Sequence, residues 1–234
     1  MATTTQPLSE VLRDTTRPQH EHAETRSFVS DLMGGRLGRA AYVDLARQHH
    51  AIYTALEGAG DRLVGGGTGG DPVAAAFVLP ELRRVPSLEA DLATLAGPTW
   101  RKELPVLAAT ETYVARLEGI ADAATYLAHA YTRYLGDLSG GQAIARMLQR
   151  HYGMTADDLT FYTFTGIEKV KPFKDHYRAL IDAAPFTFTR EERDRVVEEA
   201  KVAFDLNAAV FVALGERHVA AAEGGRETAS SGAA

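Results

Sequence analysis

The 234-residue chain contains no cysteine. Without thiolates it cannot form disulfides, zinc–cysteine sites or iron–sulfur clusters, and it has no cysteine nucleophile. Any metal chemistry must therefore use histidine, aspartate or glutamate side chains.

Long apolar runs are also missing. No stretch approaches the roughly 18 apolar residues that span a bilayer, and the N-terminal MATTTQPLSEVLRD has no apolar signal-peptide core. The formal net charge of −6 argues against general binding to nucleic acid. We expect a cytoplasmic monomer that binds neither membranes nor nucleic acid.

The two-residue alternation typical of strands is absent, and apolar residues recur at helical spacing. The clearest stripes are Leu8, Val11 and Leu12, then Tyr42, Leu45, Ala46, Ile52, Tyr53 and Leu56, and last Val197, Ala200, Phe204, Ala208, Phe211 and Val212. The pattern predicts an all-α, single-domain, multi-helix protein of about eight helices over residues 1–219. A flexible tail is expected at 220–234, and a flexible loop at the glycine-rich stretch 58–72.

The most unusual feature of the sequence is a glycine-rich segment with a helical pattern. The segment HAYTRYLGDLSGGQAIARMLQRHYG (129–153) keeps a helical pattern through Gly136, Gly140 and Gly141, although three interior glycines forfeit roughly 3 kcal/mol relative to alanine. On a helix Gly136 and Gly140 share one face, with Asp137 at its edge. This bare backbone suits the close approach of either a ligand or another helix.

The string LSGGQ (138–142) also matches the signature of ATP-binding-cassette proteins. Such an ATPase needs a G-x-x-x-x-G-K-[ST] phosphate loop and alternating strands and helices, and the sequence has neither. The ATPase interpretation is rejected.

The segment LSEVLRDTTRPQHEHAE (8–24) places His20 one helical turn before Glu24, with Arg17 one turn and Arg13 two turns before His20. Haem iron is ligated by a neutral imidazole whose second nitrogen is held by a hydrogen bond, and the two haem propionates attract cations. The segment supplies all three residue types.

Six segments carry a family resemblance: LSEVLRDTTRPQHEHAE (8–24), IYTALE (52–57), AHAYTRYLGDLSGGQ (128–142), FYTF (161–164), FKDHYR (173–178) and AKVAFDLNAAVF (200–211). With these motifs the chain resembles the haem oxygenases, particularly the soluble bacterial ones, over about residues 8–215. The first motif is similar to the proximal-helix segment of the family and the third to its distal-helix signature.

The resemblance implies a role for each matching residue. His20 would ligate the iron, with Glu24 as its hydrogen-bond partner, and Gly136, Gly140 and Gly141 would face the distal side of the ring. Asp137 would organise water that supplies protons, backed by Arg133, Tyr53 and Asn207. The remaining cofactor-binding candidates are Arg13, Arg17, Tyr131, Lys171, Lys174, Arg178 and Phe204.

The resemblance also implies a reaction. A haem oxygenase is a monooxygenase that uses O₂ and reductant to cleave haem b, at once cofactor and substrate, to biliverdin, CO and ferrous iron. Electrons would come from a separate ferredoxin or flavoprotein reductase, because no flavin or nicotinamide fingerprint is present. The basic run of Lys169, Lys171, Lys174 and Arg178 could dock such a partner.

Two other functions stay open on the sequence. A haem-binding carrier or sensor would need the same pocket, although Asp137 beside bare backbone favours an enzyme. A non-haem helical enzyme, thiaminase-like or di-iron, is the third class, but the paired Glu-x-x-His units of a di-iron bundle are not visible.

Local details also leave alternatives. His22, on a different helix face, competes with His20 as iron ligand. Pro18 implies that the first helix is either kinked or begins there, and Pro172 leaves open whether Lys171 or Lys174 meets a propionate.

Overall fold

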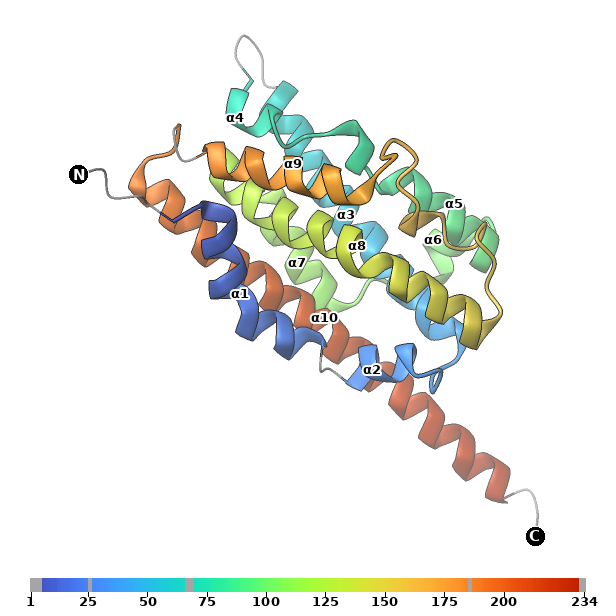
Figure 1. The fold of residues 1–234 in the computed structure, drawn as a ribbon. Coiled ribbons are helices and arrows are strands. Elements are labelled where there is room, and N and C mark those ends of the chain that lie inside the picture. Colours follow the sequence, from blue (N-terminus) through green and yellow to red (C-terminus); the bar gives the residue numbers. More distant parts are fainter. Residues whose placement is uncertain (1–5, 25–26, 66–69, 185–186, 232–234) are drawn as a thin grey trace.

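The computed structural model describes residues 6–24, 27–65, 70–184 and 187–231 (Figure 1). Side chains of residues 22–24, 27 and 219–231 lie outside the description. The elements are α1 (Leu8–Glu24), α2 (Ser27–Met33), α3 (Arg39–Gly65), α4 (Pro72–Ala75), η1 (Pro80–Leu82), α5 (Val85–Ala96), α6 (Trp100–Glu103), α7 (Ala108–Glu118), α8 (Ala123–Tyr152), η2 (Thr160–Tyr162), α9 (Val170–Ala183) and α10 (Arg190–Ser231).

The predicted all-α class is confirmed, since every regular element of the described residues is a helix. The expected number of about eight is too low, because ten α-helices and two 3₁₀ helices are present in the described part. Two of the ten, α4 and α6, have only four residues each. A single turn is too short for hydrophobic periodicity to reveal it.

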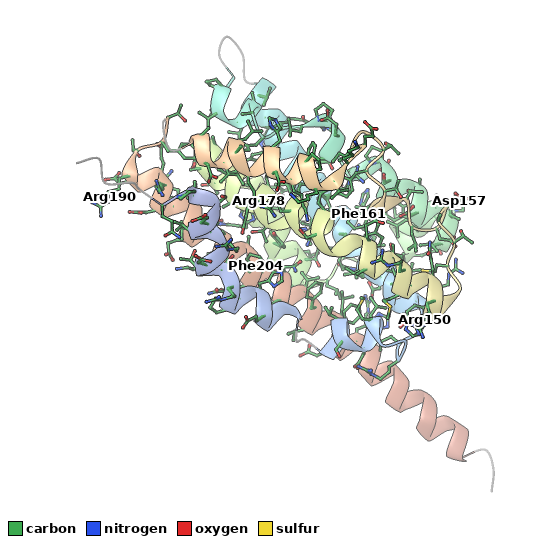
Figure 2. All side chains as sticks on the ribbon, viewed as in Figure 1. Arg150, Asp157, Phe161, Arg178, Arg190 and Phe204 are labelled. Atoms are coloured by element: carbon green, nitrogen blue, oxygen red, sulfur yellow. The ribbon has the colours of Figure 1, made fainter. Side chains whose placement is uncertain are left out.

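Helix α10 is a central packing element of the fold. Helices α1 and α8 both pack along α10, and α9 lies against the first part of α1 and against α8 (Figure 1). Helices α5 and α7 pack on α3. Side chains fill the space between the helices (Figure 2), and the core is rich in buried aromatic rings such as Tyr53, Tyr126 and Phe161.

The glycine-rich stretch 58–72 is not a loop along its whole length. Helix α3 continues to Gly65, and residues 66–69 lie outside the described part. Gly60 is buried, and a Cβ added there would lie 2.9 Å from the Tyr126 hydroxyl oxygen. The prediction was wrong for 58–65 because tertiary packing outweighs the low helix propensity of glycine.

Neither proline stops its helix. Helix α1 runs through Pro18, so the alternative in which the helix begins there is wrong. Leu8 and Leu12 are fully buried and hold the turns before it in the core. Pro172 lies in the first turn of α9, where backbone N–H groups have no partner within the helix and the loss of one costs little.

The chain end is helical as well. Helix α10 continues to Ser231 and its last turns project away from the other helices (Figure 1). Residues 220–231 are thus helical, while the flexible tail at 220–234 and the domain boundary at 219 stay predictions. No helix among the described residues is long and apolar enough to cross a membrane.

Candidate functional site

A cavity of about 770 Å³ lies between α1 and α8 and is closed by α9 and α10. Its size is in the range of roughly 300–1,000 Å³ that is typical of small-molecule sites. The lining residues are Ser9, Glu10, Arg13, Asp14, Thr16, Arg17 and His20 of α1, Tyr131, Thr132, Leu135, Gly136, Ser139 and Gly140 of α8, Asp175, Arg178, Ala179 and Asp182 of α9, and Phe204 of α10.

Eight residues predicted from the sequence line this cavity: Arg13, Arg17, His20, Tyr131, Gly136, Gly140, Arg178 and Phe204. They come from four helices, and on each of α1, α8 and α9 the lining residues recur every three or four positions. That spacing shows that each helix turns one face to the cavity.

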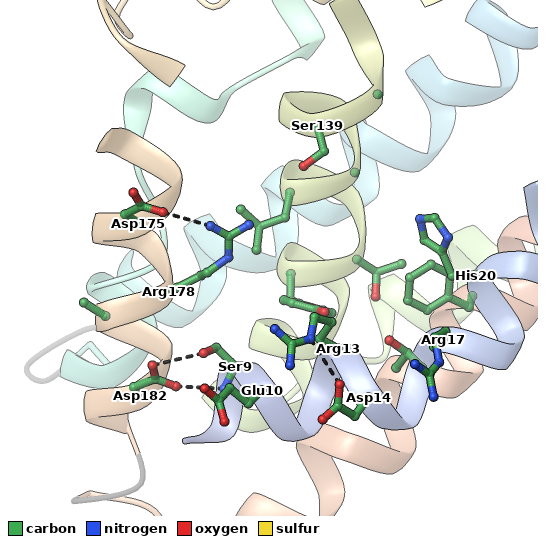
Figure 3. Close-up of a pocket in the computed structure, with 18 residues that line it drawn as sticks. Ser9, Glu10, Arg13, Asp14, Arg17, His20, Ser139, Asp175, Arg178 and Asp182 are labelled. Atoms are coloured by element: carbon green, nitrogen blue, oxygen red, sulfur yellow. Dashed lines mark hydrogen bonds and ion pairs between the residues drawn. The ribbon is translucent and has the colours of Figure 1, made fainter. Parts of the chain in front are cut away.

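Helix α1 carries His20 on the cavity side. Its ring lies 5.7 Å from the ring of Phe204, edge to face. The start of α1 is fixed to α9, because the backbone N–H and the hydroxyl of Ser9 donate to the two oxygens of Asp182 at 2.8 and 3.0 Å (Figure 3). The imidazole therefore projects from a helix that is held at its N-terminus by a neighbouring element.

Helix α8 forms the opposite wall with bare backbone. A Cβ added at Gly136 or Gly140 would meet nothing within 4 Å, so these glycines are not required by helix packing. Side chains at these positions would instead occupy the cavity. The two glycines thus keep open a flat wall across from α1.

Gly141 does not face the cavity, in contrast to the sequence prediction. It is buried, and a Cβ there would lie 2.9 Å from Cδ1 of Tyr162. The residue is small because the ring of Tyr162 packs directly on α8. One helical step of about 100° separates it from Gly140, which is enough to change its neighbour.

A polar group lies behind the glycine wall. The Tyr53 hydroxyl of α3 donates to Oδ2 of Asp137, and Arg133 stacks over the Tyr53 ring with its Cζ 5.0 Å from the ring centroid. Nη1 of Arg133 donates to Oδ1 of Asn207 at 2.7 Å. The four residues form one cluster as predicted, although none of them lines the cavity itself.

Burial dominates the electrostatics of this cluster. It raises the pKa of Asp137, whereas the positive charge of Arg133 and the hydrogen bond from Tyr53 lower it. Burial also raises the pKa of Tyr53 well above its usual value, so Tyr53 stays protonated and acts as a donor. Among the described residues, Nε and Nη2 of Arg133 are buried without a hydrogen-bond partner and can donate to water.

The cations at the cavity rim come from α1 and α9. Nη1 of Arg178 and Nζ of Lys171 both bind Asp175, at 3.0 and 2.8 Å. Lys171 and Lys174 do not line the cavity, although Nζ of Lys174 donates to Oγ of Ser139, which does, at 3.2 Å. Both lysines thus contact the cavity lining through another side chain, Lys171 through Asp175 and Lys174 through Ser139.

Two further sequence predictions concern Tyr131 of α8 and Glu24 of α1. Tyr131 lines the cavity, and burial raises its pKa, so its hydroxyl is a donor. The side chains of Glu24 and His22 lie outside the described part, so Glu24 as the partner of His20 stays a prediction.

Sequence reasoning missed several lining residues, among them Ser139, Asp175 and Asp182. Helical spacing could have found all three, because Ser139 is three residues after Gly136, and Asp175 and Asp182 lie three before and four after Arg178. Asp182 binds Ser9 across 173 residues of sequence, and no local signal reveals such a contact.

These features fit a flat ligand with acidic substituents. His20 stands on one side, the backbone at Gly136 and Gly140 leaves room on the other, and Arg13, Arg17 and Arg178 lie around the cavity. The fold and cavity define an all-α protein with a cavity between two helices, lined by a histidine on one side and by glycine backbone on the other.

Comparisons with known proteins agree with this class. The family model described as Heme oxygenase matches residues 6–213. Heme oxygenase 1 of Gallus gallus is 38% identical over 214 residues, covering 89% of this chain and 70% of the relative, and heme oxygenase 1 of Synechocystis is 34% identical over 206 residues, covering 87% and 83%. The crystal structure of Synechocystis heme oxygenase-1 in complex with heme has a TM-score of 0.85 at 31% identity, covering 95% of this chain and 99% of that one.

The chain therefore belongs to the haem oxygenase family. Membership supports the enzyme and not the carrier or sensor among the functions left open by the sequence.

Proposed function

We propose that the cavity between α1 and α8 binds haem b and that the protein uses O₂ and external electrons to open the ring to biliverdin, with release of CO and ferrous iron. As a haem oxygenase the chain is an oxidoreductase. The observation that carries the site assignment is that His20 lines one wall of the cavity while Gly136 and Gly140, free of neighbours, line the other.

The lining residues have matching tasks in binding. His20 would ligate the iron, with Glu24 as the proposed partner of its second nitrogen. Arg13, Arg17 and Arg178 would meet the propionates, because guanidinium groups bind carboxylates in two-point geometry. Lys171 and Lys174 extend this positive edge, while Phe204 packs beside His20 at 5.7 Å.

Bound haem supplies both the iron at which O₂ is activated and the carbon skeleton that is oxidised. The chain supplies the surroundings of that chemistry. Gly136 and Gly140 let the helix backbone lie close to the ring, which leaves little room for bulk water. Asp137 lies behind this wall and would hold a water molecule on the cavity side.

Asp137 is suited to passing protons through water. Burial raises its pKa, while the charge of Arg133 and the hydrogen bond from Tyr53 favour the carboxylate form. Asn207 fixes Arg133 by the 2.7 Å hydrogen bond, so the position of the cluster is set from α10. A proton would thus reach the cavity by way of water held by Asp137, and not by direct contact with an acid.

Electrons must come from another protein, for which a ferredoxin or a flavoprotein reductase is the proposed donor. Lys169, Lys171 and Arg178 are basic residues at α9, and the Lys171 side chain is 85% exposed. Such a group attracts an acidic surface and speeds encounter with it. We further propose that the protein acts as a monomer in the cytoplasm.

The test is to add hemin, a reductant and O₂ to the purified protein and to follow the visible spectrum. The wild type should show a Soret band that decays as a bile pigment appears. His20→Ala should abolish the histidine-ligated spectrum and most of the turnover, whereas His22→Ala should keep both. A loss with His22→Ala in place of His20→Ala would refute the ligand assignment, and a stable Soret band in the wild type would refute the reaction.

A further inference from the structure

The cavity carries more carboxylates than guanidinium groups. Four acidic side chains line it, namely Glu10, Asp14, Asp175 and Asp182, against the three arginines Arg13, Arg17 and Arg178. This balance is unfavourable for a ligand with two carboxylates unless the acidic side chains are bound elsewhere. Their partners therefore decide how the ligand is held.

Asp182 is bound in a way that keeps it away from the arginines. Both of its oxygens accept hydrogen bonds from Ser9 at the start of α1, where the helix dipole also favours a negative charge. This contact joins α9 to α1 and has a structural role.

Asp14 and Asp175 instead bind the arginines proposed to meet the propionates. Nε of Arg13 lies 3.1 Å from Oδ1 of Asp14. Asp175 uses both oxygens, one for Arg178 at 3.0 Å and one for Lys171 at 2.8 Å (Figure 3 draws the first). Asp175 thus occupies two of the five basic groups assigned to the ligand.

These ion pairs are easily exchanged. The side chains of Asp175 and Arg178 are 51% and 43% exposed, and Lys171 is 85% exposed. Exposed pairs of this kind are weak, because water and salt screen them. A ligand carboxylate at the same guanidinium can therefore displace Asp175 at small cost.

We propose that Asp175 is an internal competitor for the carboxylates of the bound tetrapyrrole, holding Arg178 and Lys171 when the cavity is empty and yielding them when the ligand binds. This inference rests on the proposed function. Asp175 is a positioning residue, since it acts through Arg178 and Lys171. Its negative charge lowers the affinity for haem and, equally, for the open-chain product, which keeps both carboxylates.

Removal of the charge tests this. Asp175→Asn should tighten the binding of haem about three- to five-fold, measured by titration of the Soret band, and should slow the release of biliverdin by a similar factor. The binding of haem dimethyl ester, in which both propionates are neutral, should stay as in the wild type. In an Arg178→Ala background most of the effect of Asp175→Asn should disappear.

The matched control is Asp194→Asn, which removes the same charge from an exposed pair with Arg190 on α10, outside the cavity lining. It should leave both affinities unchanged. Weaker haem binding in Asp175→Asn would overturn the proposal, because Asp175 would then orient Arg178 for the ligand. An unchanged haem affinity, or equal tightening for the ester, would overturn it as well. Failure of the wild type to bind haem would refute the proposed function instead.

Discussion

At the scale of single residues, the proposed chemistry depends on the carboxyl group of Asp137, whose pKa is moved in opposite directions by its surroundings. Burial raises the pKa of Asp137, whereas the charge of Arg133 and the hydrogen bond from the Tyr53 hydroxyl lower it. Each of these influences comes from a different contact, so each can be removed separately. The Tyr53 hydrogen bond is the simplest to remove.

Tyr53→Phe should raise the pKa of Asp137, because the hydrogen bond that favours the carboxylate is lost. The group then keeps its proton to higher pH. The acid limb of the pH profile for bile-pigment formation should move upward, while haem affinity stays within about two-fold of the wild type.

Tyr152→Phe is the control for this shift. Tyr152 is the last residue of α8, and its hydroxyl donates to the backbone oxygen of Leu32 at 2.8 Å. It should leave the pH profile in place. A profile that does not move in Tyr53→Phe would show that Asp137 is not the titrating group.

At the scale of secondary structure, α8 uses neighbouring glycines for different purposes. Gly140 has open space where its Cβ would stand, whereas Gly141 faces the ring of Tyr162 at 2.9 Å. Alanine at the two positions should therefore have opposite effects on stability.

Gly140→Ala should raise the free energy of unfolding by roughly 0.5–1 kcal/mol, because alanine has the higher helix propensity. It should also weaken haem binding, since the methyl group enters the cavity. Gly141→Ala should lower the unfolding free energy by roughly 1–3 kcal/mol through overpacking against Tyr162. Urea unfolding and haem titration of both variants measure these effects.

The signs of the two changes in unfolding free energy test these assignments. If Gly140→Ala were destabilising, or if Gly141→Ala were stabilising, the two glycines would not have the roles assigned to them. Haem affinity unchanged in Gly140→Ala would place the ring away from α8.

At the scale of the whole molecule, a hydrogen-bonded cluster around the buried carboxylate of Glu199 joins three helices. Glu199 of α10 accepts from Nε2 of His129 of α8 at 2.8 Å and from Nε of Arg116 of α7 at 2.8 Å. His129 is fully buried and the Glu199 side chain is 5% exposed. The hydrogen bonds from His129 and Arg116 outweigh burial and lower the pKa of Glu199 to about 2.

Acid should therefore weaken the fold through Glu199. Its pKa lies below the ordinary value of 4.5, so the stabilisation is complete above about pH 4.5 and is lost as the pH falls toward 2. Glu199→Gln should lower the unfolding free energy at pH 7 by about 2 kcal/mol and reduce its dependence on pH in this window. Urea unfolding at a series of pH values measures both.

The adjacent Glu198→Gln serves as the control. Glu198 is 70% exposed and binds Lys201 on the same helix. Its substitution should change stability by less than about 0.5 kcal/mol. Equal pH dependence in Glu199→Gln and in the wild type would show that the cluster does not contribute to acid stability.

The sequence by itself determined the helical class. Helical spacing placed Arg13, Arg17 and His20 on one helix and Gly136 and Gly140 on one face of another, because residues three or four apart share a face whatever the rest of the chain does. The expected roles of these residues, and the proximal and distal segments, came from the resemblance to the family. Net charge and the lack of long apolar runs set further limits, since both are read from the sequence without knowledge of the fold.

Tertiary structure alone decided which neighbour each face meets. Helical periodicity locates a face only to within about one 100° step, so it cannot separate Gly140 at the cavity from Gly141 against Tyr162. It also cannot place Asp182 at Ser9, or extend α3 through the glycines to Gly65. Those outcomes depend on contacts between segments that are distant along the chain. At these positions the free energy of packing is larger than the free energy difference set by local helix propensity.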